Sequence, residues 1–248
     1  MTSETTKEGA PFCSIVIPCY NEAANLPALL GAFAGALKSA DIELVVVDNG
    51  SSDGTGEILR RESSRLPFLR AVYCPVNLGY GGGILAGLAA ARGRLAGWAH
   101  GDLQYAPADI VAAAESLRSW REKVFFKGLR ANRSPADIFF TAGMGLFASL
   151  ALRLPLRDVN AQPTFFSREL FEGWTDPPRD FSLDLYAYAD ALRRGYAVLR
   201  RPVPLERRLH GNSTWNRGLS DRLRLSLRMA GAVLRIRGKL GAAGRAND

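Results

Sequence analysis

Three side chains that could bind a metal ion lie at alternate positions in the segment His100–Gln104. They are the imidazole of His100, the carboxylate of Asp102 and the amide of Gln104. An extended segment would project all three to one side. Together they could hold a divalent cation that keeps open positions for the oxygens of a diphosphate, and such an ion would neutralise a diphosphate leaving group.

A second group of polar residues has the chemistry of a nucleotide site. Asp48 directly follows four apolar residues, and a carboxylate at the end of a buried strand can accept hydrogen bonds from a ribose or a base edge. The alternative is that Asp48 and Asp53 only cap the turn and the next helix. The glycine-rich segment Gly79–Gly83 would let the backbone approach a ligand closely, although it is neither a P-loop nor a GxGxxG motif.

Alternating strands and helices are predicted to position these groups. Such alternation predicts an α/β fold with a mostly parallel sheet flanked by helices. In such sheets ligands bind outside the carboxyl ends of the strands, where the polar clusters 18–22, 48–55 and 100–104 fall. The expected strands are 14–18, 43–48, 69–74 and 95–99, the expected helices are 26–37, 55–65 and 84–91, and 77–83 is expected to be a loop.

The composition excludes a wholly disordered or fibrous chain, because 47% of the 248 residues are apolar and 23% are charged. The net charge of +8 is concentrated at one end, since residues 200–248 hold 12 basic and 3 acidic residues. The three cysteines have no CxxC spacing, which argues against a disulfide framework or a zinc site. We expect no secretory signal peptide, because residues 1–12 lack an apolar run, and the stretch 138–152 is shorter than the roughly 20 residues that span a bilayer.

Several segments, taken in chain order, resemble motifs of the inverting family 2 glycosyltransferases of the GT-A fold. The likeness is greatest to the branch that contains dolichol-phosphate mannose synthase and bacterial polyprenyl-phosphate glycosyltransferases. It extends over roughly residues 12–215. The matching segments are Ser14–Glu22, Val46–Thr55, Asn77–Gly83, Asp102–Pro107, Gly128–Arg130, Phe165–Glu169 and Arg208–Ser213.

The resemblance implies a role for each matching residue. The nucleotide sugar would be held by Pro18, Tyr20, Glu22, Asp48, Gly79 and Asp102; Mn²⁺ or Mg²⁺ by Asp102 and Gln104; and the acceptor phosphate by Arg130, Arg208 and Ser213. His100 and Arg133 do not match the family motifs, but they are further candidates for the metal and for the acceptor phosphate.

Three segments depart from the family pattern. His100 stands where the family has the first acid of Asp-Ala-Asp. A neutral imidazole there either ligates the metal and shifts preference from Mg²⁺ toward Mn²⁺, or hydrogen-bonds a phosphate. The helix after Arg133 carries Phe139–Thr141 where a second acceptor-side arginine is expected, and the loop Asp158–Pro163 also differs.

The implied reaction is a single in-line displacement at the anomeric carbon, with Asp102, Arg130, Asp184 and Arg208 as the catalytic candidates. A lipid-phosphate acceptor is already an anion and needs no general base, whereas a hydroxyl acceptor needs one. Asp184 is the best candidate for that base, or it is only a carboxylate in the first turn of a helix. A degenerate protein that binds a nucleotide sugar without transferring it is the remaining alternative.

The basic C-terminal segment predicts contact with an anionic membrane. We expect a flexible tail at 1–11, a catalytic domain at 12–215 and a basic amphipathic extension at 216–248, on a cytoplasmic protein peripheral to the inner membrane face. The apolar stretch 138–152 could also dip into the headgroup region of the membrane. Both the extension and this stretch could instead pack on the sheet, and no recognition motif supports nucleic-acid binding. The apolar stripe is Leu219, Leu223, Leu227, Ala230 and Leu234, and the basic one is Arg217, Arg224, Arg228 and Arg235.

Overall fold

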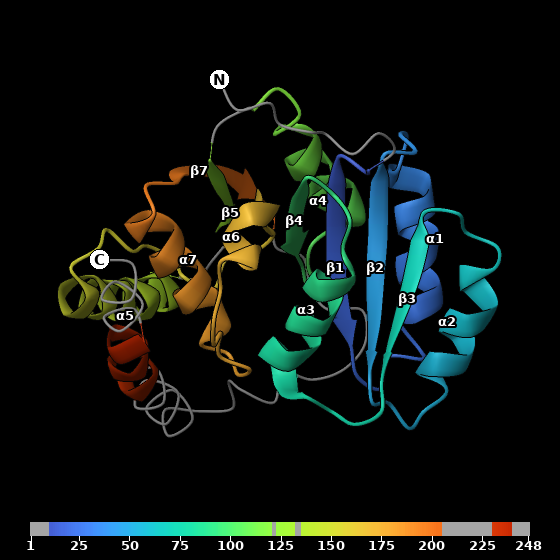
Figure 1. The fold of residues 1–248 in the computed structure, drawn as a ribbon, viewed down its shortest axis with the longest axis horizontal. Helices are drawn as coiled ribbons and strands as arrows, with labels where there is room; N and C mark the ends of the chain where they lie inside the picture. The colour runs from blue at the N-terminus through green and yellow to red at the C-terminus, as the bar shows by residue number, and fades with distance from the viewer. Residues whose placement is uncertain (1–9, 121–122, 132–134, 205–229, 240–248) are drawn as a thin grey trace.

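A computed structural model describes residues 10–120, 123–131, 135–204 and 230–239, and Figure 1 shows its sheet with helices on both faces. The strands are β1 Cys13–Cys19, β2 Ile42–Asn49, β3 Leu69–Cys74, β4 Leu95–Trp98, β5 Val124–Arg130, β6 Thr164–Ser167 and β7 Ala197–Val203. The helices are α1 Leu26–Ala36, α2 Thr55–Ser63, α3 Gly79–Ala90, α4 Pro107–Glu115, α5 Pro135–Leu152, α6 Arg168–Glu172 and α7 Leu183–Arg193, and residues 230–239 are also helical.

The described strands form one sheet in the order β3-β2-β1-β4-β6-β5-β7. Strands β3, β2, β1 and β4 are parallel neighbours, as are β5 and β7. Only β6 runs antiparallel within this sheet, and it joins β4 to β5. The predicted α/β class and mostly parallel sheet are therefore confirmed.

The central strands form because their side chains are apolar on both faces. Every residue of β2 is buried, including Val45, Val46 and Val47 in sequence. Successive strand residues point to opposite faces, so Val46 joins one core and Val45 and Val47 join the other. Helices α1, α2 and α4 cover the first face, and α3 and α7 cover the second.

Helix α3 begins earlier than its sequence predicts. It starts at Gly79, whereas residues 77–83 are expected to be a loop and the helix to begin at residue 84. The glycines permit this because the first turn packs against the backbone of another loop. A Cβ on Gly81 would lie 2.7 Å from the carbonyl carbon of Arg179, and the N–H of Gly82 donates to Arg179 O at 3.0 Å.

The described part of the C-terminal extension packs on the domain. Ala232, Val233 and Ile236 of the helix 230–239 are buried, and the latter two belong to the core on the α3 and α7 face. Leu234, which the predicted apolar stripe contains, is 61% exposed. The helix therefore packs on the domain through residues outside the predicted stripe, and contact of that stripe with a membrane stays a prediction.

None of the helices in the described ranges is both long enough and apolar enough to cross a membrane. Cys13, Cys19 and Cys74 are free, and the first two are buried. Burial raises the pKa of the Cys13 and Cys19 thiols, because a thiolate is poorly solvated inside the core.

Gly97 in β4 is a position where the fold requires glycine. A Cβ there would lie 2.0 Å from Thr164 O in the backbone of β6. We expect Gly97→Ala to lower the free energy of unfolding by about 1–3 kcal/mol or more in urea melts, because the backbone of β6 cannot move aside. Gly35→Ala in α1 is the control: nothing lies within 4 Å of its Cβ, and we expect a gain of about 0.5–1 kcal/mol. Equal stability of the two variants would contradict this account.

Candidate active site

The carboxyl ends of β1, β2, β3 and β4 meet at one edge of the sheet. Cys19 pairs with Asp48 in the parallel register of β1 and β2, and β1 pairs with β4 on its other side. The loops that follow these strands therefore lie together, as expected for a ligand site in a parallel sheet. The predicted residues at this edge are Pro18, Tyr20, Glu22, Asp48, Gly79, His100, Asp102 and Gln104.

Asp48 occupies the end of β2 and is 8% exposed. Its Oδ1 accepts a hydrogen bond from the N–H of Ser51 at 3.0 Å. The other oxygen, Oδ2, has room because residue 56 is glycine: a Cβ there would lie 2.5 Å from it. Asp48 thus both closes its turn and keeps one oxygen clear of a neighbouring side chain, which suits a hydrogen bond to a nucleoside.

Asp53 has a structural role in this edge. Its Oδ1 accepts from the N–H and the hydroxyl of Thr55, and its Oδ2 accepts from the N–H of Ala23 at 3.0 Å. Asn21 joins the same two loops, because Ser52 N donates to its Oδ1 at 2.9 Å. The loop after β1 is therefore held to the loop after β2 before any ligand binds.

The loop after β1 presents one exposed ring. Tyr20 is 49% exposed, whereas Pro18 and Glu22 are half-buried. Glu22 Oε2 accepts from the amide of Asn25 at 2.6 Å, which ties this carboxylate to the start of α1. An exposed aromatic face beside the buried Asp48 can contact a nucleotide base while the carboxylate contacts its ribose.

Asn49 also lies at this edge, although it is not among the residues predicted from the sequence. Only 4% exposed, it donates to the carbonyl of Gly79 at 3.0 Å and accepts from the N–H of Leu78 at 3.0 Å. It therefore anchors the first turn of α3 to the end of β2. The available signal was its position directly after Asp48 at the end of an apolar run.

The segment His100–Gln104 is not extended. Leu103 has φ +58°, and the N–H of Gln104 donates to Oδ1 of Asp102 at 3.2 Å. Among the residues the structure describes, no three His, Cys, Asp or Glu side chains form a group that could hold a metal ion. The segment itself offers a carboxylate, an amide and an imidazole. This donor set fits a divalent ion that takes its remaining ligands from a diphosphate.

A buried ion pair joins β5 to α7. Lys127 Nζ of β5 donates to Oδ1 of Asp184 at 3.1 Å and to the hydroxyl of Thr164 at 2.9 Å. The two charged side chains are 0% and 3% exposed. Burial lowers the pKa of Lys127, because the ammonium loses its hydration, and Asp184 opposes that change. Asp184 lies in the first turn of α7, as one of the two sequence interpretations expects.

Tyr80 connects the ion pair to the segment His100–Gln104. Its hydroxyl donates to Oδ2 of Asp184 at 2.8 Å and accepts from the amide of Gln162 at 2.7 Å. Burial, together with the nearby Asp184 carboxylate, raises the pKa of Tyr80 well above its ordinary value. Its ring stacks on Phe181 at 4.6 Å between centroids and lies 5.7 Å from the ring of His100. Tyr80 lies within the glycine-rich segment Gly79–Gly83, but no pattern along the chain indicates its contact with Asp184 or the role of Lys127.

The acceptor-side candidates are only partly described. Arg130 at the end of β5 is paired with Asp158, and its Nε donates to Oδ1 at 3.0 Å and Oδ2 at 3.2 Å. Arg200 holds the same loop by donating to the carbonyl of Asp158 at 3.2 Å. The candidates Arg133, Arg208 and Ser213, and residues 216–229 of the extension, lie outside the described residues.

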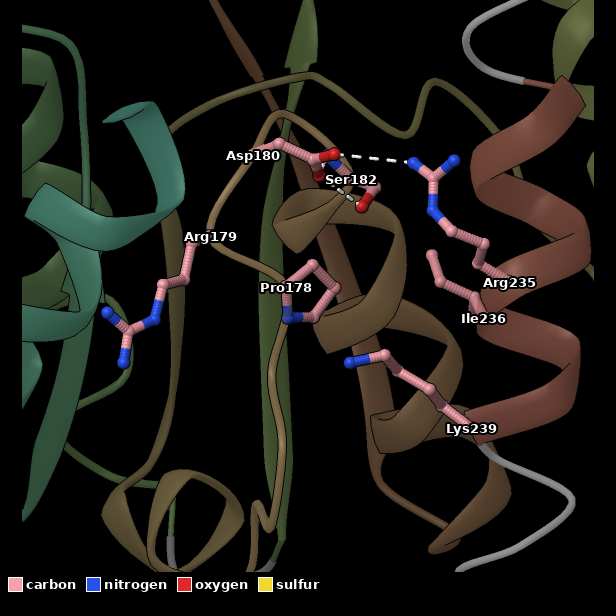
Figure 2. Close-up of a pocket in the computed structure, with 7 residues that line it drawn as sticks. All are labelled: Pro178, Arg179, Asp180, Ser182, Arg235, Ile236 and Lys239. Atoms are coloured by element: carbon pink, nitrogen blue, oxygen red, sulfur yellow. Dashed lines mark hydrogen bonds and ion pairs between the residues drawn. The ribbon is translucent and has the colours of Figure 1, made fainter. Parts of the chain in front are cut away.

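A cavity of about 380 Å³ separates the loop before α7 from the helix 230–239 (Figure 2). Arg235 closes one side by bonding to Asp180 at 3.3 Å, and Lys239 donates to the carbonyl of Asp176 at 2.9 Å. Arg179 extends from the same loop toward α3, away from Arg235 and Lys239 (Figure 2). The cavity is thus a seam between the extension and the domain.

Comparison with known families and proteins identifies the family of the chain and its fold. The model of the family "Glycosyl transferase family 2" matches residues 14–142, which is more than half of the chain. An undecaprenyl-phosphate 4-deoxy-4-formamido-L-arabinose transferase from Aeromonas hydrophila is 36% identical over 42% of this chain and 32% of its own length. A dodecaprenyl-phosphate galacturonate synthase from Rhizobium johnstonii is 37% identical over 48% and 36%. The chain therefore spans about a third of the length of these two relatives.

A more extensive match is a dolichyl-phosphate beta-glucosyltransferase from Trichomonas vaginalis, 28% identical over 64% of this chain and 54% of its own length. Among solved structures, glucosyl-3-phosphoglycerate synthase from Mycobacterium tuberculosis, in complex with Mn²⁺, UDP and phosphoglyceric acid, superposes with a TM-score of 0.70. That match has 23% identity and covers 93% of this chain and 79% of the other. At this identity it shows the shared GT-A fold.

Proposed function

Because the chain belongs to glycosyl transferase family 2, we propose that it moves a hexose from a nucleoside-diphosphate sugar to a polyprenyl phosphate. The main support for this proposal is the acceptor named for the relatives described above. Three that differ in sugar and in organism are all named for transfer to a polyprenyl or dolichyl phosphate. The edge formed by β1, β2 and β4 supports it with a site suited to a nucleotide.

The donor is assigned to this edge. Asp48 and the exposed ring of Tyr20 would bind the nucleoside, with Pro18, Glu22 and Gly79 shaping the space around it. Asp102, with His100 and Gln104 beside it, would hold Mn²⁺ or Mg²⁺ against the diphosphate. When bound, the ion would supply positive charge to the departing nucleoside diphosphate. A structural neighbour crystallised with both Mn²⁺ and UDP is consistent with this assignment.

The proposed reaction inverts the anomeric carbon in one in-line displacement. The acceptor phosphate attacks from the face opposite the leaving diphosphate, so the reacting groups must be held in line. Arg130 would orient that phosphate, which would replace Asp158 as its partner. Arg133, Arg208 and Ser213 are proposed to complete the phosphate site from segments near it.

The surroundings of Asp184 favour an acceptor that needs no general base. Its Oδ1 accepts a bond from Lys127 and its Oδ2 accepts one from Tyr80, and the side chain is almost fully buried. A general base must reach the proton it removes. We therefore interpret Asp184 as a structural group, and an acceptor that is already an anion fits the site better than a hydroxyl.

The acceptor would place the enzyme at a membrane. Polyprenyl phosphates are membrane lipids, and we propose that the protein is peripheral to the cytoplasmic face. The basic segment 216–248 would contribute through arginines, each adding about 1 kcal/mol near an anionic surface.

The decisive experiment incubates the purified full chain with a panel of nucleotide sugars, undecaprenyl or dolichyl phosphate, and Mn²⁺ or Mg²⁺. We expect one donor to yield a lipid-linked sugar, detected by mass spectrometry of the organic extract. Parallel reactions replace the lipid by 3-phosphoglycerate or by a glycan. Transfer only to one of those acceptors would overturn the proposed acceptor, and donor binding without transfer to any acceptor would point to a binding protein.

A further inference from the structure

Helix α5 has an exposed apolar face, defined by Ile138, Phe139, Leu146, Phe147 and Leu150. Phe139 is 84% exposed, Leu150 is 71% and Leu146 is 62%. These five make up almost half of the large apolar side chains that are exposed in the described residues. No charged residue interrupts the chain from Ile138 to Leu152. Such a concentration on one helix marks an interaction surface.

The opposite side of α5 already packs on the protein. Gly145 and Ala148 are buried, and Ala148 belongs to the core on the α3 and α7 face. The hydroxyl of Ser149 donates to the carbonyls of Gly145 and Leu156 and accepts from the N–H of Leu156 at 3.0 Å. These contacts set the rotation of the helix, so the apolar face of α5 points away from the domain.

Cationic side chains lie at the same end of the molecule. Arg153 and Arg157, just beyond the C-terminus of α5, are exposed. The helix 230–239 lies at that end too, far from α1 and α2 (Figure 1), and exposes Arg235 and Arg237. An apolar helix face with arginines around it is the pattern of a helix that lies in the interface of an anionic bilayer.

A second copy of the chain fits this surface less well. Two copies that met through the apolar face of α5 would bring their arginines together, and like charges repel. An anionic lipid surface instead offers apolar chains to the leucines and phenylalanines, and negative charge to the arginines.

The position of α5 also relates this surface to the acceptor. Arg130 ends β5, and α5 begins at Pro135, so the proposed phosphate-binding arginine lies within five residues of the helix. Leu129, next to Arg130, is itself 41% exposed. A bilayer seated on α5 would therefore hold its headgroups close to the end of β5.

We propose that the apolar face of α5 is the surface by which this protein binds an anionic bilayer, lying in the interface without crossing it. The link to the acceptor rests on the proposed function, but membrane binding itself does not. In the described residues the helix 230–239 packs on the domain through Ala232, Val233 and Ile236, whereas the apolar face of α5 stays exposed.

The test compares the full chain with the double variant Phe139→Ser/Leu150→Ser in flotation with vesicles of phosphatidylcholine and phosphatidylglycerol. Val76→Ser is the matched control, because Val76 is 60% exposed but follows β3, distant from α5 along the sheet. We expect the double variant to lose at least about tenfold in partition coefficient, because two large apolar side chains no longer enter the bilayer. Val76→Ser should bind as the original chain does. Circular dichroism melts would establish that both variants fold.

Equal partition of the double variant and the control would overturn the proposal. So would light scattering that showed a dimer dissociated by the double substitution with vesicle binding unchanged, since the face would then join two copies. Transfer to a short, water-soluble isoprenyl phosphate separates the two proposals. Retained transfer by the double variant supports membrane docking, whereas vesicle binding by a chain that transfers sugar to no prenyl phosphate would contradict the proposed function alone.

Discussion

Asp102→Asn is expected to reduce sugar transfer by about 10³-fold at saturating donor, because several kcal/mol of transition-state stabilisation by a metal ion would be lost. Asparagine keeps the side-chain oxygen that accepts from the N–H of Gln104, so the loop should hold its shape. What it removes is the negative charge that would retain the cation.

The matched control is Asp109→Asn, which removes a carboxylate from the first turn of α4, a few residues after the segment His100–Gln104. It should change transfer by less than about twofold and stability by about 0.5–1 kcal/mol at most through the helix dipole. Manganese binding, followed by electron paramagnetic resonance in the presence of nucleoside diphosphate, should weaken for Asp102→Asn alone. Transfer by Asp102→Asn at the original rate would exclude Asp102 as the essential metal ligand.

Lys127→Met should be the most destabilising substitution considered. It leaves the carboxylate of Asp184 buried without its cation, and breaking one partner of a buried ion pair typically costs about 3–5 kcal/mol. The bond to Thr164 is lost as well. We expect this loss in the free energy of unfolding measured by urea denaturation.

A double-mutant cycle tests whether loss of the ion pair causes this destabilisation. Lys127→Met combined with Asp184→Leu removes both charges, and replacing a whole buried pair by apolar residues is often close to neutral. The double variant should therefore be more stable than Lys127→Met alone, although Tyr80 loses the acceptor for its hydroxyl. If the losses of the single variants simply add, the ion pair is not coupled as the geometry indicates.

Local sequence pattern was sufficient to predict the sheet and many of the polar residues at the carboxyl ends of β1, β2 and β4. Runs such as Leu44–Val47 form strands because their side chains are apolar on both faces, and the apolar run stops at Asp48, one residue before β2 ends. The predicted bounds of the first four strands differ from the structure by at most one residue at either end. Position at the carboxyl end of a strand then brought the clusters around Tyr20, Asp48 and Asp102 to one edge.

Features that depend on distant partners could not be found this way. Lys127 and Asp184 are 57 positions apart, and they meet because β5 and α7 are brought together by the order of the sheet. Arg130 and Asp158 are likewise far apart along the chain and meet only in the folded structure. The early start of α3 depends on the loop at Arg179, whose backbone only glycine can approach so closely.

By itself, the sequence determined the fold class, the edge that carries the polar residues, and the family these motifs resemble, because strand periodicity and residue type at strand ends are local properties. Tertiary structure alone decided which polar groups are paired and which apolar surfaces remain exposed. In α5, where apolar residues occur on every side, only packing against the domain shows that Phe139 and Leu150 face outward. Pairing and exposure are properties of neighbours in space, which spacing along the chain does not record.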